Sequence, residues 1–357
     1  MDQIVFEERN MDNKLEVSVI LPVYNAERTI RKTILSVLEQ KDVLLELVVI
    51  NDGSIDGTCN VLNEFKNKEN IKIFTQENKG VSYARNEGIR NARGEYCFFI
   101  DSDDYLEKST LAKMISLAKA ESLELVSCSH REINSTMNLA YNNPNKSLVV
   151  ASSDEISKNY DLFYFQSACA KLFNTNIIKK NSLYFNTSMD LGEDLNFSLN
   201  YLLYVSRIGY INSANYIINN VNPYSLSKRY SFNMENDIEI QIASWRKLAS
   251  LYPTLNIEYQ KKHMNFELYL LKVYFGNLFR FDSPLSIKVK VKKIGTILKK
   301  YNNWTEKSSS KGNPQNFIDK ISSNVICTNN VLLIYIFFYV KEKIRRIKFF
   351  VGRKKNA

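Results

Sequence analysis

The sequence predicts an α/β fold in which a mostly parallel sheet is flanked by helices and followed by a helical C-terminal extension. Two observations support this. The N-terminal part repeats a strand-turn-helix unit, and its strand segments are apolar throughout, which is typical of strands buried on both faces. Strands that alternate with helices are joined by right-handed crossovers, so their carboxyl ends lie at one edge of the sheet. We therefore expect the polar turns after these strands to converge.

The first unit begins with a short apolar strand at residues 17–21, which we expect Pro22 to stop. Asn25 is a residue type that favours a helix N-cap, so it is expected to begin the helix that follows. The apolar positions of that helix recur with the helical period: Ile30, Ile34, Val37 and Leu38.

Three more units follow. The second strand, residues 45–50, ends in Asn51-Asp52-Gly53-Ser54, and a helix follows it. The third strand, residues 71–75, leads through Asn78-Lys79-Gly80 into a helix at residues 82–91. The fourth, residues 95–100, ends at Asp101, so Asp52 and Asp101 are expected at the same edge of the sheet.

The run Asp101-Ser102-Asp103-Asp104 follows the fourth strand directly. Three crowded carboxylates repel one another, and this repulsion lowers the stability of the folded protein unless a cation neutralises them. Carboxylate oxygens suit Mg²⁺ and Mn²⁺, and these ions also bridge to phosphates. The cluster therefore indicates a metal that holds a diphosphate. The alternative is a turn that caps the next helix, where Asp and Ser are favoured in any case.

Four motifs in this order resemble the nucleotide-binding half of the family 2 glycosyltransferases, and the resemblance covers roughly residues 15–230. They are Val19 to Asn25, Asn51 to Ser54 with Asp56, Asn78 to Gly80 with Ala84 to Asn86, and Asp101 to Asp104. The resemblance implies a GT-A fold, a nucleotide-sugar donor, a divalent metal (Mg or Mn) and inversion at the anomeric carbon. The glycine fingerprints of dehydrogenases and P-loop NTPases are absent from the sequence.

The resemblance also implies roles for residues in the first three turns. Pro22 and Tyr24 would form the floor and wall against which base and ribose rest. Glu27, expected in the first turn of the first helix, would face the base or ribose, or would only complement the helix dipole. Asp52 would accept a hydrogen bond from the uracil N–H, although an Asp before Gly-Ser is also ordinary turn chemistry. Asn78 is placed in the same nucleotide-sugar site.

The fourth motif carries the remaining roles on the donor side. Arg85 would reach the diphosphate or sit against the acidic cluster, unless it lies on a solvated helix face. By the family pattern, Asp101 contacts the ribose and sugar, with Ser102 beside it. Asp103 is the metal ligand, and Asp104 has no assigned role.

A sugar hydroxyl is protonated at neutral pH, so a carboxylate must take its proton as the new bond forms. We expect this second acidic site at Gly192-Glu193-Asp194, which opens a helix with Leu195, Leu199, Leu202 and Leu203 on one face and Gly209 just past its end. In the family, the second member of such a pair is the base, which is Asp194 here. Glu193 would orient the acceptor or the helix start. Alternatively, both acids only complement the helix dipole.

Other segments of the acceptor half agree with the family in part. Lys171-Leu172-Phe173 and Ser225-Leu226-Ser227 match its pattern. The segment from Asn219 to Tyr224 departs from it, because the family often carries Arg or His there. Lys228 and Arg229 are candidates to replace that diphosphate contact.

The composition of the chain indicates its size class and its cellular environment. The chain has 357 residues, 45% of them hydrophobic, with 48 Lys and Arg against 38 Asp and Glu, which gives a net charge of +10. It is long enough for two domains. Five cysteines without paired or metal-type spacing indicate reduced thiols in a cytosol, with Cys97 and Cys128 expected in the core. The N-terminus lacks the apolar region of a signal peptide, so export is not expected.

The C-terminal segment is both apolar and basic. The run from Val331 to Val340 is about ten residues long, whereas a bilayer span needs about twenty. Because Lys and Arg follow it, we expect the segment to dock on the anionic face of the cell membrane. The alternatives are packing on the catalytic domain, or nucleic-acid binding, which lacks an accompanying reading motif.

These observations divide the chain into five parts. An N-terminal tail (1–14) precedes a GT-A domain (15–232), which has a nucleotide-binding half (15–104) and an acceptor half (105–232). A helical extension (233–307), a linker (308–316) and an amphipathic basic segment (317–357) follow. The predicted activity is inverting transfer from a nucleotide-sugar, with a UDP-sugar favoured, to a sugar hydroxyl of a lipid-linked acceptor in bacterial surface polysaccharide synthesis. No nucleic-acid partner is expected. The alternatives are a non-catalytic glycan- or lipid-binding relative and a sugar nucleotidyltransferase.

Overall fold

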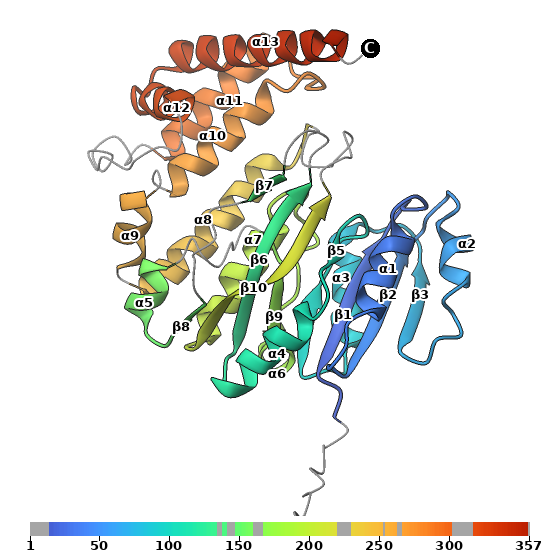
Figure 1. Cartoon of the computed structure of the whole chain (residues 1–357). Helices are drawn as coiled ribbons and strands as arrows, with labels where there is room; N and C mark the ends of the chain where they lie inside the picture. The colour runs from blue at the N-terminus through green and yellow to red at the C-terminus, as the bar shows by residue number, and fades with distance from the viewer. Residues whose placement is uncertain are drawn as a thin grey trace, which may run out of the picture. The chain divides into compact units, whose positions relative to one another are not determined.

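The computed structural model divides into two compact units, built from Met1–Leu148, Cys169–Tyr184 and Gly209–Asn219, and from Val149–Ala168, Phe185–Ile208 and Asn220–Ala357. Each unit is considered by itself. Figure 1 shows the elements of both units. The structure describes residues 14–133, 138–140, 147–159, 167–219, 230–252, 254–262, 266–301 and 317–355.

A parallel sheet forms the centre of the first unit, as predicted. Its strands are β1 (Val17–Val23), β2 (Leu45–Asp52), β3 (Ile71–Gln76) and β4 (Tyr96–Phe99), in the order β3-β2-β1-β4. Every residue of β1, β2 and β4 is buried. The sheet continues beyond β4 with strands from the later chain, in the order β9 (Lys171–Asn174), β6 (Leu125–Ile133), β10 (Ile208–Asn219) and β5 (Tyr105–Leu106).

Four local predictions were wrong, each because tertiary context overrode a local signal. Strand β1 continues through Pro22, which is tolerated because pairing with β4 has already ended at Ile20. Asn25 is not the cap of α1 (Ile30–Leu38), whose N-cap is Thr29. The predicted helix after Gly192 is α7 (Glu193–Tyr201), followed by a single turn of 3₁₀-helix, and Gly209 lies in strand β10.

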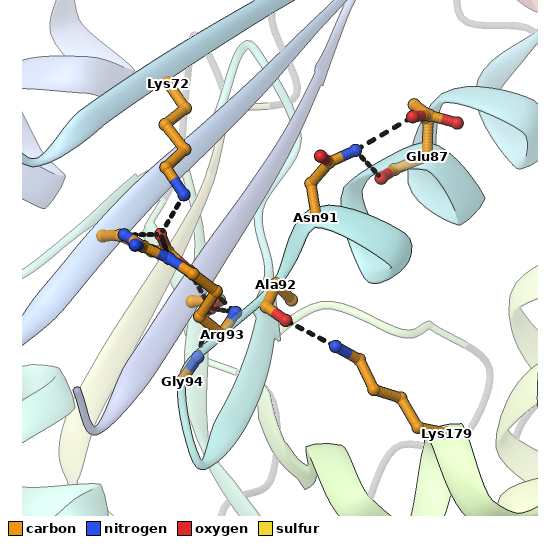
Figure 2. Close-up of polar contacts among 9 residues, drawn as sticks. Lys72, Glu87, Asn91, Ala92, Arg93, Gly94 and Lys179 are labelled. Atoms are coloured by element: carbon orange, nitrogen blue, oxygen red, sulfur yellow. Dashed lines mark hydrogen bonds and ion pairs between the residues drawn. The ribbon is translucent and has the colours of Figure 1, made fainter. Parts of the chain in front are cut away.

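The buried carboxylate of Glu46 joins chain segments at the amino-terminal end of the parallel strands. Glu46 is 2% exposed and accepts from Ser18 Oγ (2.7 Å), Arg93 Nε (3.0 Å) and Lys72 Nζ (3.2 Å). Burial raises the pKa of Glu46, but the donors outweigh burial and lower it overall. Figure 2 shows Lys72 and Arg93 directed to this point and Lys179 bonded to a nearby backbone carbonyl. This network joins the turn before β4 to β1 and β2, at the opposite end of the strands from Asp52 and Asp101.

The second unit is largely helical. Its longer helices are α7, α8 (Met234–Leu251), α9 (Leu255–Lys262), α10 (Phe266–Leu278), α11 (Ile287–Lys300), α12 (Phe317–Cys327) and α13 (Val331–Lys355). Aromatic rings fill its interior: Trp245 stacks on Phe266 with 4.2 Å between ring centroids. Among the residues that the structure describes, no helix is both long and apolar enough to span a bilayer. The predicted linker at 308–316 and residues 1–13 lie outside the described residues.

Candidate active site

The turns after β1 and β2 are bonded to each other. Asn25 donates its N–H to Ser54 Oγ (3.0 Å), and its own Oδ1 accepts from the Ile55 N–H (2.9 Å). Ala26 donates its N–H to Thr58 Oγ1 at 2.8 Å. Asn25 has φ +49°, a left-handed conformation that Asn adopts more readily than most residues. Its role is therefore to join two turns at the carboxyl edge of the sheet, rather than to cap a helix.

Glu27 and Tyr24 lie in the first of these turns. Glu27 precedes α1 and is not in its first helical turn, which corrects the sequence-based placement. Its Oε2 accepts from the Gly57 N–H at 3.2 Å, and its own N–H donates to Asp56 Oδ2 at 3.2 Å. Tyr24 is 48% exposed and follows the buried Pro22 closely in the chain. The turn thus carries an exposed aromatic side chain and a carboxylate that is held by a hydrogen bond to the next turn.

Asp52 organises the turn after β3. The side chain is 3% exposed, and it accepts from Gln76 Nε2 (2.7 Å), the Lys79 N–H (2.9 Å) and the Gly80 N–H (2.8 Å). Asn78, in the same turn, is exposed. A carboxylate has about four lone-pair positions, and these hydrogen bonds use three of them. Asp52 is thus both an anchor for this turn and an acceptor with capacity left.

Arg85 lies against the acidic cluster. It comes from α3 (Val81–Asn91), is 3% exposed, and donates from Nη2 to Asp101 Oδ1 at 3.0 Å. Arg85 is therefore not on a solvated helix face. The Asp101 side chain remains 41% exposed. The guanidinium supplies a buried positive charge directly behind an accessible carboxylate.

The acidic cluster is electrostatically crowded. Burial and the charge of Asp101 raise the pKa of Asp103 to about 6, and the same two causes, with Asp103, raise the pKa of Asp104 to about 8. Asp104 accepts from Tyr216 Oη at 2.6 Å and from the Asn219 N–H at 2.9 Å, so it anchors the end of β10. Tyr216 and this role of Asp104 were missed by sequence reasoning, because β10 is far away in the chain.

The donor set of the cluster fits a hard cation. Asp101 and Asp103 present carboxylate oxygens, and their mutual repulsion would be relieved by a positive ion. Within the described part of the chain, no three His, Cys, Asp or Glu side chains gather as a complete metal cage. Mg²⁺ does not need one, since it commonly uses one or two carboxylates together with substrate phosphates. The residues are therefore suited to an ion shared with a diphosphate.

A polar face of α1 supports the acidic turn from beneath. Thr33 Oγ1 lies within hydrogen-bond distance of the backbone oxygens of Ser102 (3.1 Å) and Asp104 (2.7 Å). Ser36 Oγ and the Gln40 amide bond backbone groups of the chain that follows. Thr33 and Ser36 lie three residues apart on α1, and Gln40 lies two residues past the end of the helix at Leu38. Their polar character in and just after an apolar helix is the signal that could have revealed them.

In the second unit, Glu193 and Asp194 are the first residues of α7, and both are partly buried. Asp194 Oδ2 accepts from the Ala168 N–H at 3.1 Å. The helix begins at Gly192, whose φ is +84°. A Cβ at Gly192 would lie 2.4 Å from Gln241 Nε2, so the backbone conformation favours glycine and any side chain there would displace the Gln241 amide.

Helix α8 supports this second acidic turn. Asp237 is fully buried and accepts from the Leu191 N–H at 3.1 Å. Gln241 Nε2 donates to the Leu191 carbonyl at 3.4 Å, and Ser244 Oγ accepts from Asn196 Nδ2 at 2.8 Å. Burial raises the pKa of Asp237 to about 6. Sequence reasoning missed this polar face, whose only local sign is the spacing of Asp237, Gln241 and Ser244.

Several predicted residues cannot be placed. Residues 220–229 lie outside the described residues, and they include the Ser225–Ser227 motif together with Lys228 and Arg229.

Lys171 is fully buried in β9, and its Nζ donates to the Cys169 carbonyl at 3.1 Å. Lys171 therefore contributes to the interior of the first unit.

Comparison with known proteins identifies the domain. Residues 18–182 match the family described as Glycosyl transferase family 2. These residues are a family 2 glycosyltransferase domain. EpsJ of Bacillus subtilis, described as an uncharacterized glycosyltransferase, is 28% identical over 218 residues, which are 59% of this chain and 63% of EpsJ. The chain spans less than two thirds of the length of the first curated relatives that it matches.

Solved structures share the fold of the family 2 domain and its extension. The structure of Staphylococcus aureus TarS residues 1–349 in complex with UDP-GlcNAc has a TM-score of 0.64 and 19% identity, and the match covers 94% of this chain and 92% of that one. A Pyrobaculum calidifontis mannosyltransferase in complex with GDP-Man and Mn²⁺ has a TM-score of 0.50 at 15% identity and covers 92% of this chain and 87% of that one. The predicted GT-A fold is confirmed.

Proposed function

We propose that this protein transfers a sugar from a UDP-sugar to a hydroxyl of a glycan acceptor, with inversion. The observation that carries the proposal is the cluster Asp101 to Asp104, which follows a buried parallel strand and is backed by the buried Arg85. Ligands of open α/β sheets bind at this edge. The family 2 domain and the likeness to TarS, which was solved with UDP-GlcNAc, support a nucleotide-sugar donor.

The nucleotide would bind across the turns after β1, β2 and β3. Asp52 has one lone-pair position beyond its three protein donors, and this would accept the uracil N–H. Tyr24 and Pro22 would hold the base and ribose. Glu27 and Asn78, each in a turn that other residues brace, would bond the polar groups at the rim.

The diphosphate would bind at the acidic cluster. Asp103 would hold the Mg²⁺ or Mn²⁺ ion, and Asp101 with Ser102 would contact the ribose and sugar. When bound, the ion supplies Lewis acidity that offsets the charge on the leaving diphosphate. Arg85 would orient the Asp101 carboxylate through the 3.0 Å hydrogen bond. The structural relative solved with GDP-Man and Mn²⁺ supports a divalent ion in this fold.

Asp194 would be the general base. It lies in the first turn of α7, and the hydrogen bond from the Ala168 N–H to its Oδ2 orients the carboxylate. As the acceptor oxygen bonds to the anomeric carbon, its proton passes to Asp194 and the bond to UDP breaks, which inverts the configuration in one displacement. Glu193, next in the chain, would orient the acceptor.

The acceptor and setting follow from the family resemblance and the charge of the chain. We place the protein in the cytoplasm at the inner face of the bacterial cell membrane, where a lipid-linked sugar would be extended during surface polysaccharide synthesis. The +10 charge suits an anionic surface. A nucleic-acid partner is not part of the proposal.

The test is a panel of nucleotide-sugars, incubated with Mn²⁺ and purified full-length protein in detergent, with release of free UDP as the measurement. We expect metal-dependent release from one UDP-sugar, and loss of release in Asp103→Ala with weaker UDP binding only when metal is present. Equal release by wild type and Asp103→Ala would contradict the metal assignment. Absence of both release and UDP binding would contradict the donor assignment, whereas UDP binding without release, even with acceptor glycans, would favour a non-catalytic relative.

A further inference from the structure

One face of α13 is apolar and exposed. Its side chains are between 42% and 64% exposed and recur at intervals of three, four or seven residues, which places them along one side of the helix. We call them the outer face of α13: Leu332, Leu333, Ile336, Tyr339, Val340, Ile344 and Ile347. Single exposed apolar residues are ordinary, but a continuous row of this length indicates an interaction surface.

The opposite face of α13 is packed within the second unit. Ile334 and Phe338 are 0% and 2% exposed. The Phe338 ring centroid lies 5.6 Å from that of Phe275 on α10, and the Tyr335 ring centroid lies 5.1 Å from that of Phe279, just past the end of α10. One side of α13 is therefore covered by other residues of the second unit, and the outer face is the side directed away from them.

Helix α13 also carries positive charge along its apolar outer face. Helix α13 contains eight Lys and Arg residues and one acid, Glu342. Lys343 is exposed and stands four residues after Tyr339, on the outer face, with Nζ 5.5 Å from the Tyr339 ring centroid. The Glu342 side chain is 12% exposed and is paired with Arg345 and Arg346. The outer face therefore combines apolar side chains with positive charge and carries no acid.

We propose that the outer face of α13 lies against an anionic lipid surface, with the helix parallel to the membrane plane. A helix of this kind inserts its apolar side chains at the boundary between headgroups and acyl chains, while Lys and Arg meet the headgroups. A second copy of the chain is a poorer occupant, because the same face of the second copy would bury Lys343 without offering an acid to pair with it. The inference depends on the proposed function only for its purpose, which is access to a lipid-linked acceptor.

The experiment is sedimentation of the full-length protein with vesicles of phosphatidylcholine alone, or of equal parts phosphatidylcholine and phosphatidylglycerol. The test variant is the double substitution Ile336→Ser and Ile347→Ser. Its matched control is Leu251→Ser with Ile257→Ser, because these residues are 55% and 58% exposed but lie on α8 and α9. We expect wild type and control to bind the anionic vesicles. The test variant should lose about tenfold in partitioning per side chain, roughly a hundredfold in total.

Lys343→Glu should weaken binding to the anionic vesicles and leave binding to the neutral ones unchanged. UDP binding measured without lipid should be the same for all variants, so failure of the proposed transferase activity is seen separately from failure of membrane binding. Anionic binding by the test variant equal to that of the control would overturn the proposal. So would a wild-type dimer in sedimentation equilibrium that the test variant abolishes without changing vesicle binding.

Discussion

The two acidic turns of this protein are each held by the polar face of a helix, but the chemistry of the two faces differs. The Asp101–Asp104 turn and the residues that follow it are held by Thr33 and Ser36 of α1 and by Gln40 just past its end, all uncharged. Beside the turn that precedes Asp194, α8 uses Gln241 and Ser244 together with a fully buried acid, Asp237. Uncharged side chains hold their turn in the same way at any pH. A buried acid changes its protonation state with pH, so the stability of the turn that it holds changes too.

This difference teaches that the support of a site carries its own pH dependence, apart from that of the catalytic groups. The turn at Asp101 is already crowded with negative charge, and a neutral support adds none. The turn before Asp194 offers backbone N–H groups to α8, so an acid is a strong acceptor there. Burial nevertheless penalises the ionised form of Asp237, and its pKa is raised to about 6.

The largest expected effect separates the roles of the two turns. Asp194→Asn should lower transfer about 10²- to 10⁴-fold, because the acceptor proton loses its base, while UDP affinity stays unchanged. Asp103→Ala should instead weaken metal-dependent UDP binding. Acceptor turnover and UDP binding, measured for both variants beside Glu193→Gln, provide the comparison. A loss of UDP affinity in Asp194→Asn equal to that in Asp103→Ala would mean that the two turns do not divide these tasks.

The second prediction concerns the pH dependence of the α8 support. The pKa of Asp237 is raised from 3.8 to about 6, so the folded protein holds this proton after the unfolded chain has lost it. Stability from this group is therefore fully present below about pH 4 and lost as the pH rises to 6, by up to about 3 kcal/mol. Urea unfolding from pH 4 to pH 8 should show a smaller decline in Asp237→Asn than in wild type. Identical declines would show that Asp237 is ionised in the folded protein throughout.

The third prediction compares one glycine from each region. Gly80 and Gly192 both have positive φ, but a Cβ at Gly80 would meet no atom within 4 Å, whereas at Gly192 it would meet Gln241. Gly80→Ala should cost about 1–3 kcal/mol from backbone strain alone, because φ +93° with ψ 163° is a conformation essentially restricted to glycine. Gly192→Ala should cost about 1–3 kcal/mol more, because Gln241 must move.

Chemical denaturation of these variants tests the distinction. Adding Gln241→Ala to Gly192→Ala should recover part of the loss, since it removes the clash but not the strain. Equal costs at the two glycines, with no recovery in the double variant, would show that Gln241 yields without penalty.

The sequence by itself determined the parallel strands and the residues at their ends. Continuous apolar runs report burial on both faces, and parallel strands bring their carboxyl ends to one edge, so Asp52 and Asp101 could be placed from local pattern and handedness alone. The helical character of the C-terminal extension was also readable from composition and periodicity. None of these inferences requires knowledge of a distant partner.

The tertiary structure alone decided what holds those residues in place. Tyr216 bonds Asp104 across 112 positions of sequence, and Asp237 reaches Leu191 across 46. Asn25 was mistaken for a helix cap because its true partners, Ser54 and Ile55, lie on the next turn of the sheet. A buried polar group is stable only when a partner is present, and which partner is present depends on how distant segments pack. For that reason local pattern located the acidic turns but not their supports.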